Sequence, residues 1–136
     1  MSKKIFPYLG LALALLLYVV VKQQQGKPGR ENIRIETDAI VAEDFNRSPQ
    51  KITYSKHALC RMKCRYISDA EVRAILAKGT INTSKIQRSQ KGISVPLEGR
   101  TSDGQKVRIV FAPKGKEEMV VVTVIDLEKE YSCDCK

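Results

Sequence analysis

The sequence has no tryptophan, a single histidine and few aromatic residues, which make up 6% of its 136 residues. It also lacks the glycine-rich nucleotide-binding motifs G-x-x-x-x-G-K-S/T and G-x-G-x-x-G, the zinc-protease motif H-E-x-x-H and the hydrolase motif G-x-S-x-G. Because His57 is the only histidine, an acid–base pair of two imidazoles is excluded. These absences argue against nucleotide-binding, zincin and serine-hydrolase functions, and the length leaves room for one small domain.

The longest uncharged stretch is residues 5–21, IFPYLGLALALLLYVVV, with lysines on both sides. As an α-helix it reaches about 25 Å, which suffices for a bilayer when the flanking lysines extend to the interface. No small-residue cleavage site follows it, so residues 1–22 are predicted to be an uncleaved membrane anchor whose partner is lipid. A cleaved signal peptide and a buried helix of a soluble protein are the alternatives.

Residues 23–50 are predicted to be a tether followed by a short acidic segment, because they begin with a polar stretch that contains Gly26, Pro28 and Gly29. Scattered apolar residues indicate one short element within this segment, but the pattern does not decide its type. The remaining residues, 51–136, are expected to form a single small α+β domain.

Charge is distributed unevenly along the chain, although the formal net charge is only +9. Residues 47–116 hold 16 Lys/Arg and 4 acidic residues, and the segments on either side of this block are acidic. Such a basic centre predicts a face that binds a polyanion, with a simple solvated basic surface as the alternative.

Two helices are predicted from capping residues and apolar spacing. Ser55 is a good N-cap for the first helix, and Ser68 to Glu71 form a capping box for the second, which ends near Gly79. At 100° per residue, the apolar side of the first helix, predicted to face the core, comprises Ala58, Leu59, Met62 and Tyr66. Its opposite side comprises His57, Cys60, Arg61, Cys64 and Arg65.

Beyond Gly79 the apolar period changes to two, which predicts strands near residues 93–98, 106–112 and 119–127. Pro96 is expected to place the first of these at an edge or a bulge. The order predicts two helices packed on a three- or four-stranded antiparallel sheet.

One motif of the first helix resembles a known family. The pattern His-Ala-x-x-Arg-Met-x-x-Arg, here His57, Ala58, Arg61, Met62 and Arg65, together with segments of residues 52–127, resembles the bacterial domain-of-unknown-function family 4258. That family is similar in its helix-helix-sheet order to the RelE and BrnT toxins, which are metal-independent ribonucleases with a barnase-like scaffold. The resemblance therefore implies, at one remove, a ribonuclease-type fold.

For such a metal-independent cleavage, the candidate catalytic residues are His57, Arg61 and Arg65. A neutral His57 near the helix N-terminus would take the proton of a ribose 2′-OH, and the two guanidiniums would stabilise the charge on the phosphorane. Further candidate contacts to a polyanion such as RNA are Arg100, Lys106 and Arg108.

The sequence contains four cysteines, in two local pairs. Cys60 and Cys64 lie one turn apart on the predicted helix, and Cys133 and Cys135 lie near the end of the chain. They predict two disulfides between helix and tail, a tetrahedral zinc site, or thiols that are merely neighbours.

These observations leave three functions open. The first is a membrane-anchored binding module whose basic face meets a polyanion or a partner protein, and the second is a ribonuclease-like enzyme. The third is a zinc or thiol-redox protein. The resemblance and the anchor together predict a single-pass protein of the bacterial inner membrane. The charges on the two sides of the anchor do not decide on which side the domain lies, and the exported side is slightly favoured.

Overall fold

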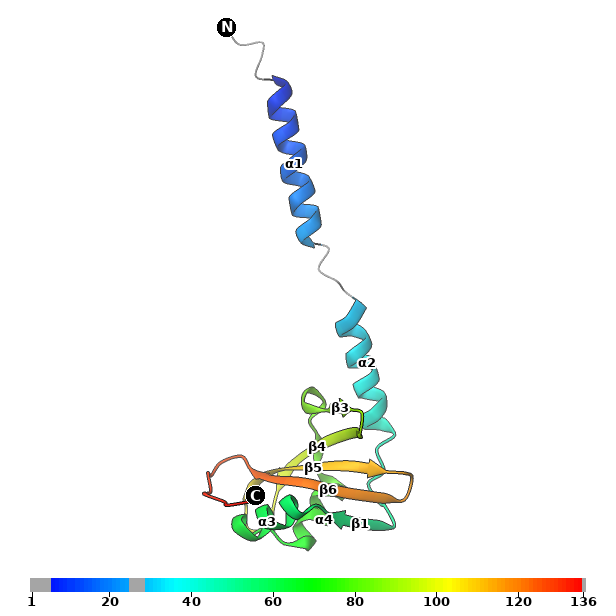
Figure 1. Cartoon of the computed structure of the whole chain (residues 1–136), viewed down its shortest axis with the longest axis vertical. Helices are drawn as coiled ribbons and strands as arrows, with labels where there is room; N and C mark the ends of the chain where they lie inside the picture. Colours follow the sequence, from blue (N-terminus) through cyan, green and yellow to red (C-terminus); the bar gives the residue numbers. More distant parts are fainter. Residues whose placement is uncertain (1–5, 25–28, 136) are drawn as a thin grey trace. The chain divides into compact units, whose positions relative to one another are not determined.

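The computed structural model describes residues 6–24 and 29–135, and these fall into two compact units, Met1–Glu36 and Thr37–Lys136 (Figure 1). The first unit contains helix α1 (Phe6–Gln24). Helix α2 (Gly29–Glu43) follows, and its residues from Thr37 onward belong to the second unit. The element of undecided type in the acidic segment is therefore a helix.

Helix α1 includes the polar residues Lys22 and Gln23 as well as most of the predicted anchor. Within residues 6–24 and 29–135, no helix is both long enough and apolar enough to cross a membrane. The predicted anchor over residues 5–21 is thus not supported, and Ile5 lies outside the described residues.

The second unit contains a mixed sheet with the strand order β1-β6-β5-β4-β2, to which β3 adds by pairing with β4. The strands are β1 (Lys51–Tyr54), β2 (Thr80–Ile81), β3 (Gln87–Ser89), β4 (Gly92–Arg100), β5 (Lys106–Lys114) and β6 (Glu118–Asp126). The α+β class and the three long antiparallel strands are confirmed. The expectation of a purely antiparallel sheet was wrong, because the four-residue strand β1 pairs in parallel with β6.

Strand β4 changes partners at its proline. Its first residues pair with β3, whereas Leu97 and Glu98 pair with β2. Pro96 lies between these two stretches, and its carbonyl accepts a hydrogen bond from the backbone N–H of Asn82 at 2.9 Å. Pro96 has no N–H to donate, and it lies between the residues of β4 that pair with β3 and those that pair with β2. A proline is therefore tolerated here, although β4 is paired on both sides.

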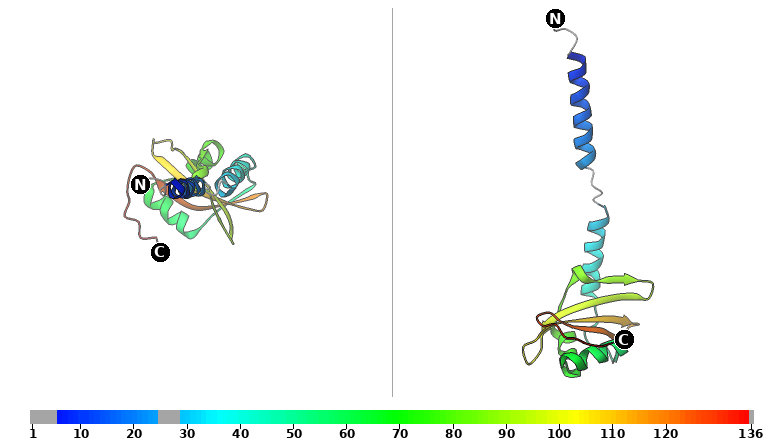
Figure 2. Two further views of the ribbon diagram at one scale, coloured as in Figure 1. Left: turned by 90° about the horizontal axis from the view of Figure 1, so that it is seen from above. Right: turned by 60° about the vertical axis from the view of Figure 1, so that its left-hand side comes forward.

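One face of the sheet is covered by helices α3 (Lys56–Arg65) and α4 (Asp69–Lys78), as the views of Figures 1 and 2 agree. Val72, Ile75 and Leu76 form the buried stripe of α4, as predicted. The helix approaches β4 closely, since a Cβ on Gly99 would lie 2.6 Å from Cδ1 of Ile75. The core between helices and sheet is aliphatic, with Phe111 its largest fully buried side chain.

The second half of α2 and the segment after it complete this core. Phe45 packs edge-on against Phe111, with ring centroids 6.5 Å apart, and the buried carboxylate of Asp38 pairs with Arg88 on β3. Arg47 donates through Nη1 to the carbonyl oxygens of Leu76 and Gly79 at 3.2 and 2.8 Å. Its guanidinium thereby satisfies carbonyl groups at the C-terminal end of α4.

Candidate binding site on helix α3

Helix α3 begins at Ser55, whose hydroxyl accepts the N–H of Ala58 at 2.9 Å and donates to the carbonyl of Val122 at 2.8 Å. The cap therefore also fastens the start of the helix to β6. At the other end, Tyr66 adopts the left-handed conformation (φ 57°, ψ 38°), and its N–H bonds back to the carbonyls of Met62 and Lys63. A non-glycine residue in this region carries a steric cost, because its Cβ crowds the following carbonyl.

The side chains of α3 divide into three faces. The core face consists of the buried residues Ala58, Met62 and Arg65. The tail face, which carries the disulfides, consists of His57, Cys60, Arg61 and Cys64. The open face consists of the exposed residues Lys56, Leu59, Lys63 and Tyr66, which fall on one side of the helix at 100° per residue.

This arrangement corrects the predicted inward side of α3. Leu59 is 53% exposed and Tyr66 is 80% exposed, whereas Arg65 is only 7% exposed. The sheet is approached through Ala58 and Met62, so the helix is rotated relative to the expectation. The aliphatic stem of Arg65 then fills a position where an apolar side chain was expected.

The tail, residues 128–135, is bonded to the tail face by two disulfides. Cys60 is joined to Cys135 and Cys64 to Cys133, with Cα–Cα distances of 5.7 and 5.9 Å. One of the three predicted states of the cysteines is therefore the one found. The zinc alternative was wrong, because all four thiols are consumed and the described part of the chain has no cluster of His, Cys, Asp or Glu suited to a metal ion.

Arg65 is held among α3, β6 and the tail. Its Nη1 donates to the carbonyl of Val124, and its own carbonyl accepts Nε2 of Gln105 at 3.1 Å. Burial lowers the pKa of Arg65 from its ordinary value, and the neighbouring charge of Arg61 lowers it further, whereas the carboxylate of Asp126 opposes the shift. The guanidiniums of Arg61 and Arg65 therefore lie near each other, and the carboxylate of Asp126 partly offsets their charge.

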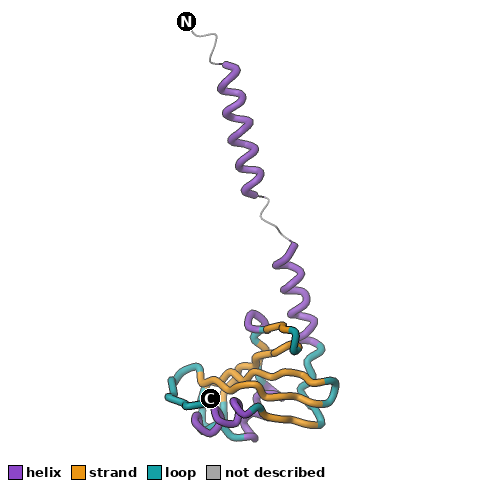
Figure 3. Tube along the Cα trace, in the orientation of Figure 1, coloured by secondary structure: helices purple, strands orange, loops and turns teal. Residues whose placement is uncertain are grey.

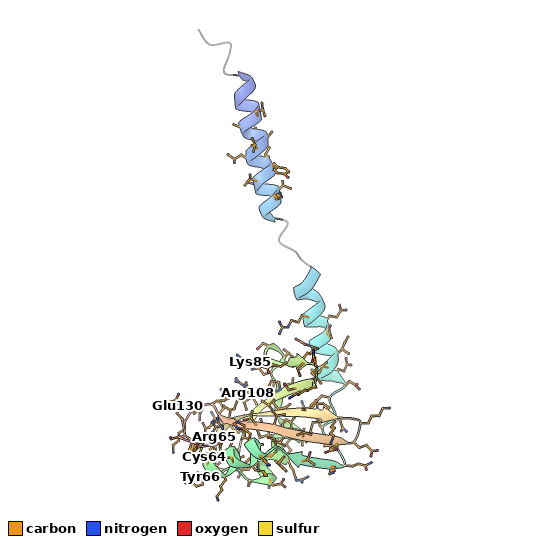
Figure 4. All side chains as sticks on the ribbon, viewed as in Figure 1. Cys64, Arg65, Tyr66, Lys85, Arg108 and Glu130 are labelled. Atoms are coloured by element: carbon orange, nitrogen blue, oxygen red, sulfur yellow. A yellow bond between two sulfur atoms is a disulfide. The ribbon has the colours of Figure 1, made fainter. Side chains whose placement is uncertain are left out.

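Three buried polar atoms at this place make no hydrogen bond. They are the Nε atoms of Arg61 and Arg65 and the Oε1 atom of Gln105, and no other described side chain has such an atom. Tyr131 of the tail contacts the same group, because its hydroxyl accepts Nε2 of Gln105 at 3.2 Å. Figure 4 shows Cys64 and Arg65 at the end of the domain where the tail residue Glu130 lies. Unpaired donors that are buried together are costly, and each one calls for an explanation.

The predicted catalytic residues lie on two faces of the helix. His57 is exposed and shares the tail face with Arg61, whereas the guanidinium of Arg65 turns into the fold. A catalytic role for the three residues stays a prediction.

The predicted polyanion contacts on the sheet have acidic neighbours. Arg108 donates from Nε to Oε1 of Glu98 at 2.7 Å, and Arg100 pairs with Glu128 at 3.3 Å. Lys106 is exposed. By contrast, none of the ion pairs among the described residues involves a side chain of α3, although this helix contains four cations and no acid.

The open face of α3 was missed by the sequence reasoning, because Leu59 and Tyr66 were assigned to the core. One signal was available: Tyr66 directly precedes Ile67 and the capping box at Ser68, so it occupies the position that ends the first helix. A residue that ends a helix in the left-handed conformation no longer follows the 100° spacing of the helix, so its side chain need not lie on the buried side.

Comparisons with known proteins give one match. The family model described as "Domain of unknown function (DUF4258)" matches residues 54–126, which include β1's last residue and run to the end of β6. No curated protein and no solved structure matches the chain, so the similarity to RelE-type toxins is not confirmed. The helix motif that carried the resemblance lies within the matched region, and the chain belongs to the DUF4258 family.

Proposed function

We propose that the domain is a binding module for single-stranded nucleic acid and that it binds through the open face of α3. The observation that carries the proposal is the exposure of Tyr66 at the end of a helix whose exposed Lys56 and Lys63 have no acidic partner among the described residues. Proteins that bind single strands combine cations for the phosphates with an aromatic ring on which a base stacks.

The geometry of the open face fits this role. Lys56 and Lys63 are seven residues apart, so they lie on the same side of the helix about 10 Å from each other along its axis. Tyr66 follows Lys63 by three residues, and both side chains are exposed. Figure 4 shows the labelled Tyr66 at the outer edge of the domain, away from the sheet.

The conformation of Tyr66 adds a second argument. Glycine is the residue that ends helices in the left-handed conformation without steric cost, yet the chain has tyrosine there, with its ring in solvent. A strained residue whose side chain makes little use of the core is typical of a functional position.

The disulfides support binding in an oxidising, exported environment, since structural disulfides persist there and are rare in the cytosol. Binding rather than catalysis is favoured because the tail is disulfide-bonded to the face of α3 on which Arg61 lies, and Arg61 is half-buried there, although His57 is exposed.

The proposal is tested by fluorescence anisotropy with labelled oligo(U) and oligo(dT), using the oxidised full-length protein at several salt concentrations. Tyr66→Ala is expected to weaken binding by roughly fivefold or more, because stacking of one base contributes about 1–3 kcal/mol. Lys63→Glu should also weaken it and reduce the slope of affinity against salt.

Two matched variants serve as controls. Tyr66→Phe keeps the stacking surface and should bind as the wild type does, and Lys91→Glu reverses a charge on the β3–β4 turn, away from α3. Full binding by Tyr66→Ala and Lys63→Glu would overturn the proposal. So would an absence of oligonucleotide binding by the wild type, which would direct attention to a protein partner for the same face.

A further inference from the structure

We infer that the tail covers a latent phosphate-binding site made of Arg61, Arg65 and Gln105, and that reduction of the two disulfides opens it. The site lies on a different face of α3 from the one proposed to bind nucleic acid, so the two proposals stand or fall separately. Its ligand class is a tetrahedral oxyanion, either free phosphate or a phosphate ester.

The guanidinium groups of Arg61 and Arg65 each have an unpaired donor. Both Nε–H groups, of Arg61 and of Arg65, are buried without a hydrogen-bond acceptor, and Arg65 as a whole is only 7% exposed. Guanidinium groups match phosphate oxygens in geometry and charge. The two guanidiniums are close enough to interact electrostatically, and neither Nε–H has an acceptor, so an anion that accepts from both suits them. The remaining unpaired atom of the group, Oε1 of Gln105, is an acceptor and makes no favourable contact with such an anion.

Gln105 links Arg65 to the tail. Its Nε2 donates one hydrogen to the carbonyl of Arg65 and the other to the hydroxyl of Tyr131. When Tyr131 leaves, the second N–H becomes a free donor next to the two guanidiniums. The hydroxyl of the tail residue thus occupies the place of a ligand acceptor.

Besides the disulfides, non-covalent contacts hold the tail against the domain. These contacts include the Tyr131–Gln105 hydrogen bond and the exposed Arg100–Glu128 ion pair. The side chain of Lys129 lies over the ring of Tyr131, 4.8 Å from its centroid, but this contact is within the tail. Backbone pairing with the sheet ends at Leu127, whose N–H donates to Lys106. Sγ of Cys60 also lies 3.8 Å from the carbonyl oxygen of Asp134. A segment that is not paired with the sheet opens at a low free-energy cost once its covalent links are removed.

The opening reaction is thiol–disulfide exchange with a dithiol reductant. One thiolate of the dithiol attacks a sulfur of the Cys60–Cys135 bond and forms a mixed disulfide, and its second thiolate displaces the remaining cysteine. Each disulfide gains two electrons and two protons and becomes two thiols, while one dithiol becomes a cyclic disulfide. A second dithiol reduces the Cys64–Cys133 bond in the same way.

The experiment titrates inorganic phosphate and glycerol 3-phosphate into the full-length protein, with calorimetry and amide chemical shifts as readouts. Wild type in the oxidised state is compared with Cys133→Ser/Cys135→Ser, which releases the tail without a reductant. The released variant is expected to bind at least about tenfold more tightly, with shifts at the amides of α3. Adding Arg61→Gln should abolish this gain, whereas adding Lys91→Gln, which removes a charge elsewhere, should leave it unchanged.

A second variant covers the case in which the tail-free protein does not fold. Tyr131→Ala keeps both disulfides and frees Gln105, and it should bind phosphate more tightly than wild type does. Equal affinity of oxidised wild type and the released variant would show that the tail covers nothing. If neither Cys133→Ser/Cys135→Ser nor Tyr131→Ala binds phosphate, the proposed site does not exist. The same conclusion follows if the gain in affinity persists when Arg61→Gln is added.

Discussion

Helices α3 and α4 are both ten residues long, both begin at a serine cap and both pack on the same face of the sheet, yet they are held in place differently. Figure 3 shows them as the two adjoining helices beside the strands. α4 follows the rules for an amphipathic helix: acidic residues at its start, an aliphatic buried stripe and an arginine over its last carbonyls. α3 has no acid, buries an arginine, exposes a leucine and a tyrosine, and is linked to the tail by two disulfides.

The two helices are thus stabilised by different means: α4 by its aliphatic stripe, and α3 by the disulfides in addition to a smaller apolar contact. A helix held by aliphatic packing needs no covalent link, because burial of its stripe already stabilises it. On α3 only Ala58 and Met62 bury apolar side chains, so packing contributes less to its stability. The two disulfides add stability at the helix positions Cys60 and Cys64.

The largest effect is expected when both disulfides are removed, as in Cys133→Ser/Cys135→Ser. Closing a loop of this length restricts the unfolded chain by about 4 kcal/mol, so the free energy of unfolding should fall by about that amount in urea denaturation. Either bond alone closes nearly the same loop, spanning 75 or 69 residues, so a variant lacking one pair should lose far less than half. Equal, additive losses from the two single-pair variants would contradict this account.

The next effect belongs to the packing of α4. Leu76→Ala removes a side chain that is 1% exposed and should lower the free energy of unfolding by about 3 kcal/mol, since it leaves a cavity in the core. Leu59→Ala on α3, the matched control, should change it by no more than about 0.5 kcal/mol. Similar losses from the two leucine variants would show that α3 packs as α4 does.

A gain in stability is expected at the end of α3. Tyr66→Gly removes the steric cost of the left-handed conformation and should raise the free energy of unfolding by about 1 kcal/mol. The same variant lacks the ring, so its affinity for oligonucleotides should fall. A variant that loses both stability and binding would indicate that Tyr66 is structural.

The smallest effect is a dependence on pH to which α4 contributes and α3, which contains no acid, does not. Asp69 in its first turn accepts from Arg73 and from the hydroxyl of Tyr54, and these contacts hold the pKa of its carboxyl below the ordinary value. The stabilisation is therefore complete above the ordinary pKa of aspartate, about 3.9, and is lost as the pH falls through the lowered value.

Thermal unfolding measured from pH 6 to pH 2 tests this dependence. Asp69→Asn should flatten the acid limb of the melting-temperature curve, whereas Glu117→Gln, an exposed control, should leave it unchanged. The effect is small because the Arg73–Asp69 pair is more than half exposed. An acid limb that is identical in wild type and Asp69→Asn would refute it.

The parts of the fold that local sequence patterns govern were predicted well. The capping box at Ser68, the buried stripe of α4 and the three long strands follow from periods and caps that act within a few residues. The β1–β6 pair was not predicted, because a four-residue strand carries a weak signal and the residues that it pairs with lie 67 positions further along the chain.

The candidate site was predicted only in its composition. The sequence placed His57, Arg61 and the cysteines on one side of a helix, and the structure places them there. It could not show that Arg65 turns inward or that Tyr66 turns outward, since the rotation of a ten-residue helix depends on what it packs against. The pairing of the four cysteines likewise depended on where the tail runs after β6.

The parallel pairing of β1 with β6 also has a consequence for the order of assembly. A domain whose first strand is completed by its last cannot close while the chain is still emerging from a ribosome or an export channel, and such long-range pairing slows folding. Cys133 and Cys135 emerge later still. Closure of the sheet and formation of both disulfides therefore have to wait for the same last part of the domain, which follows β5.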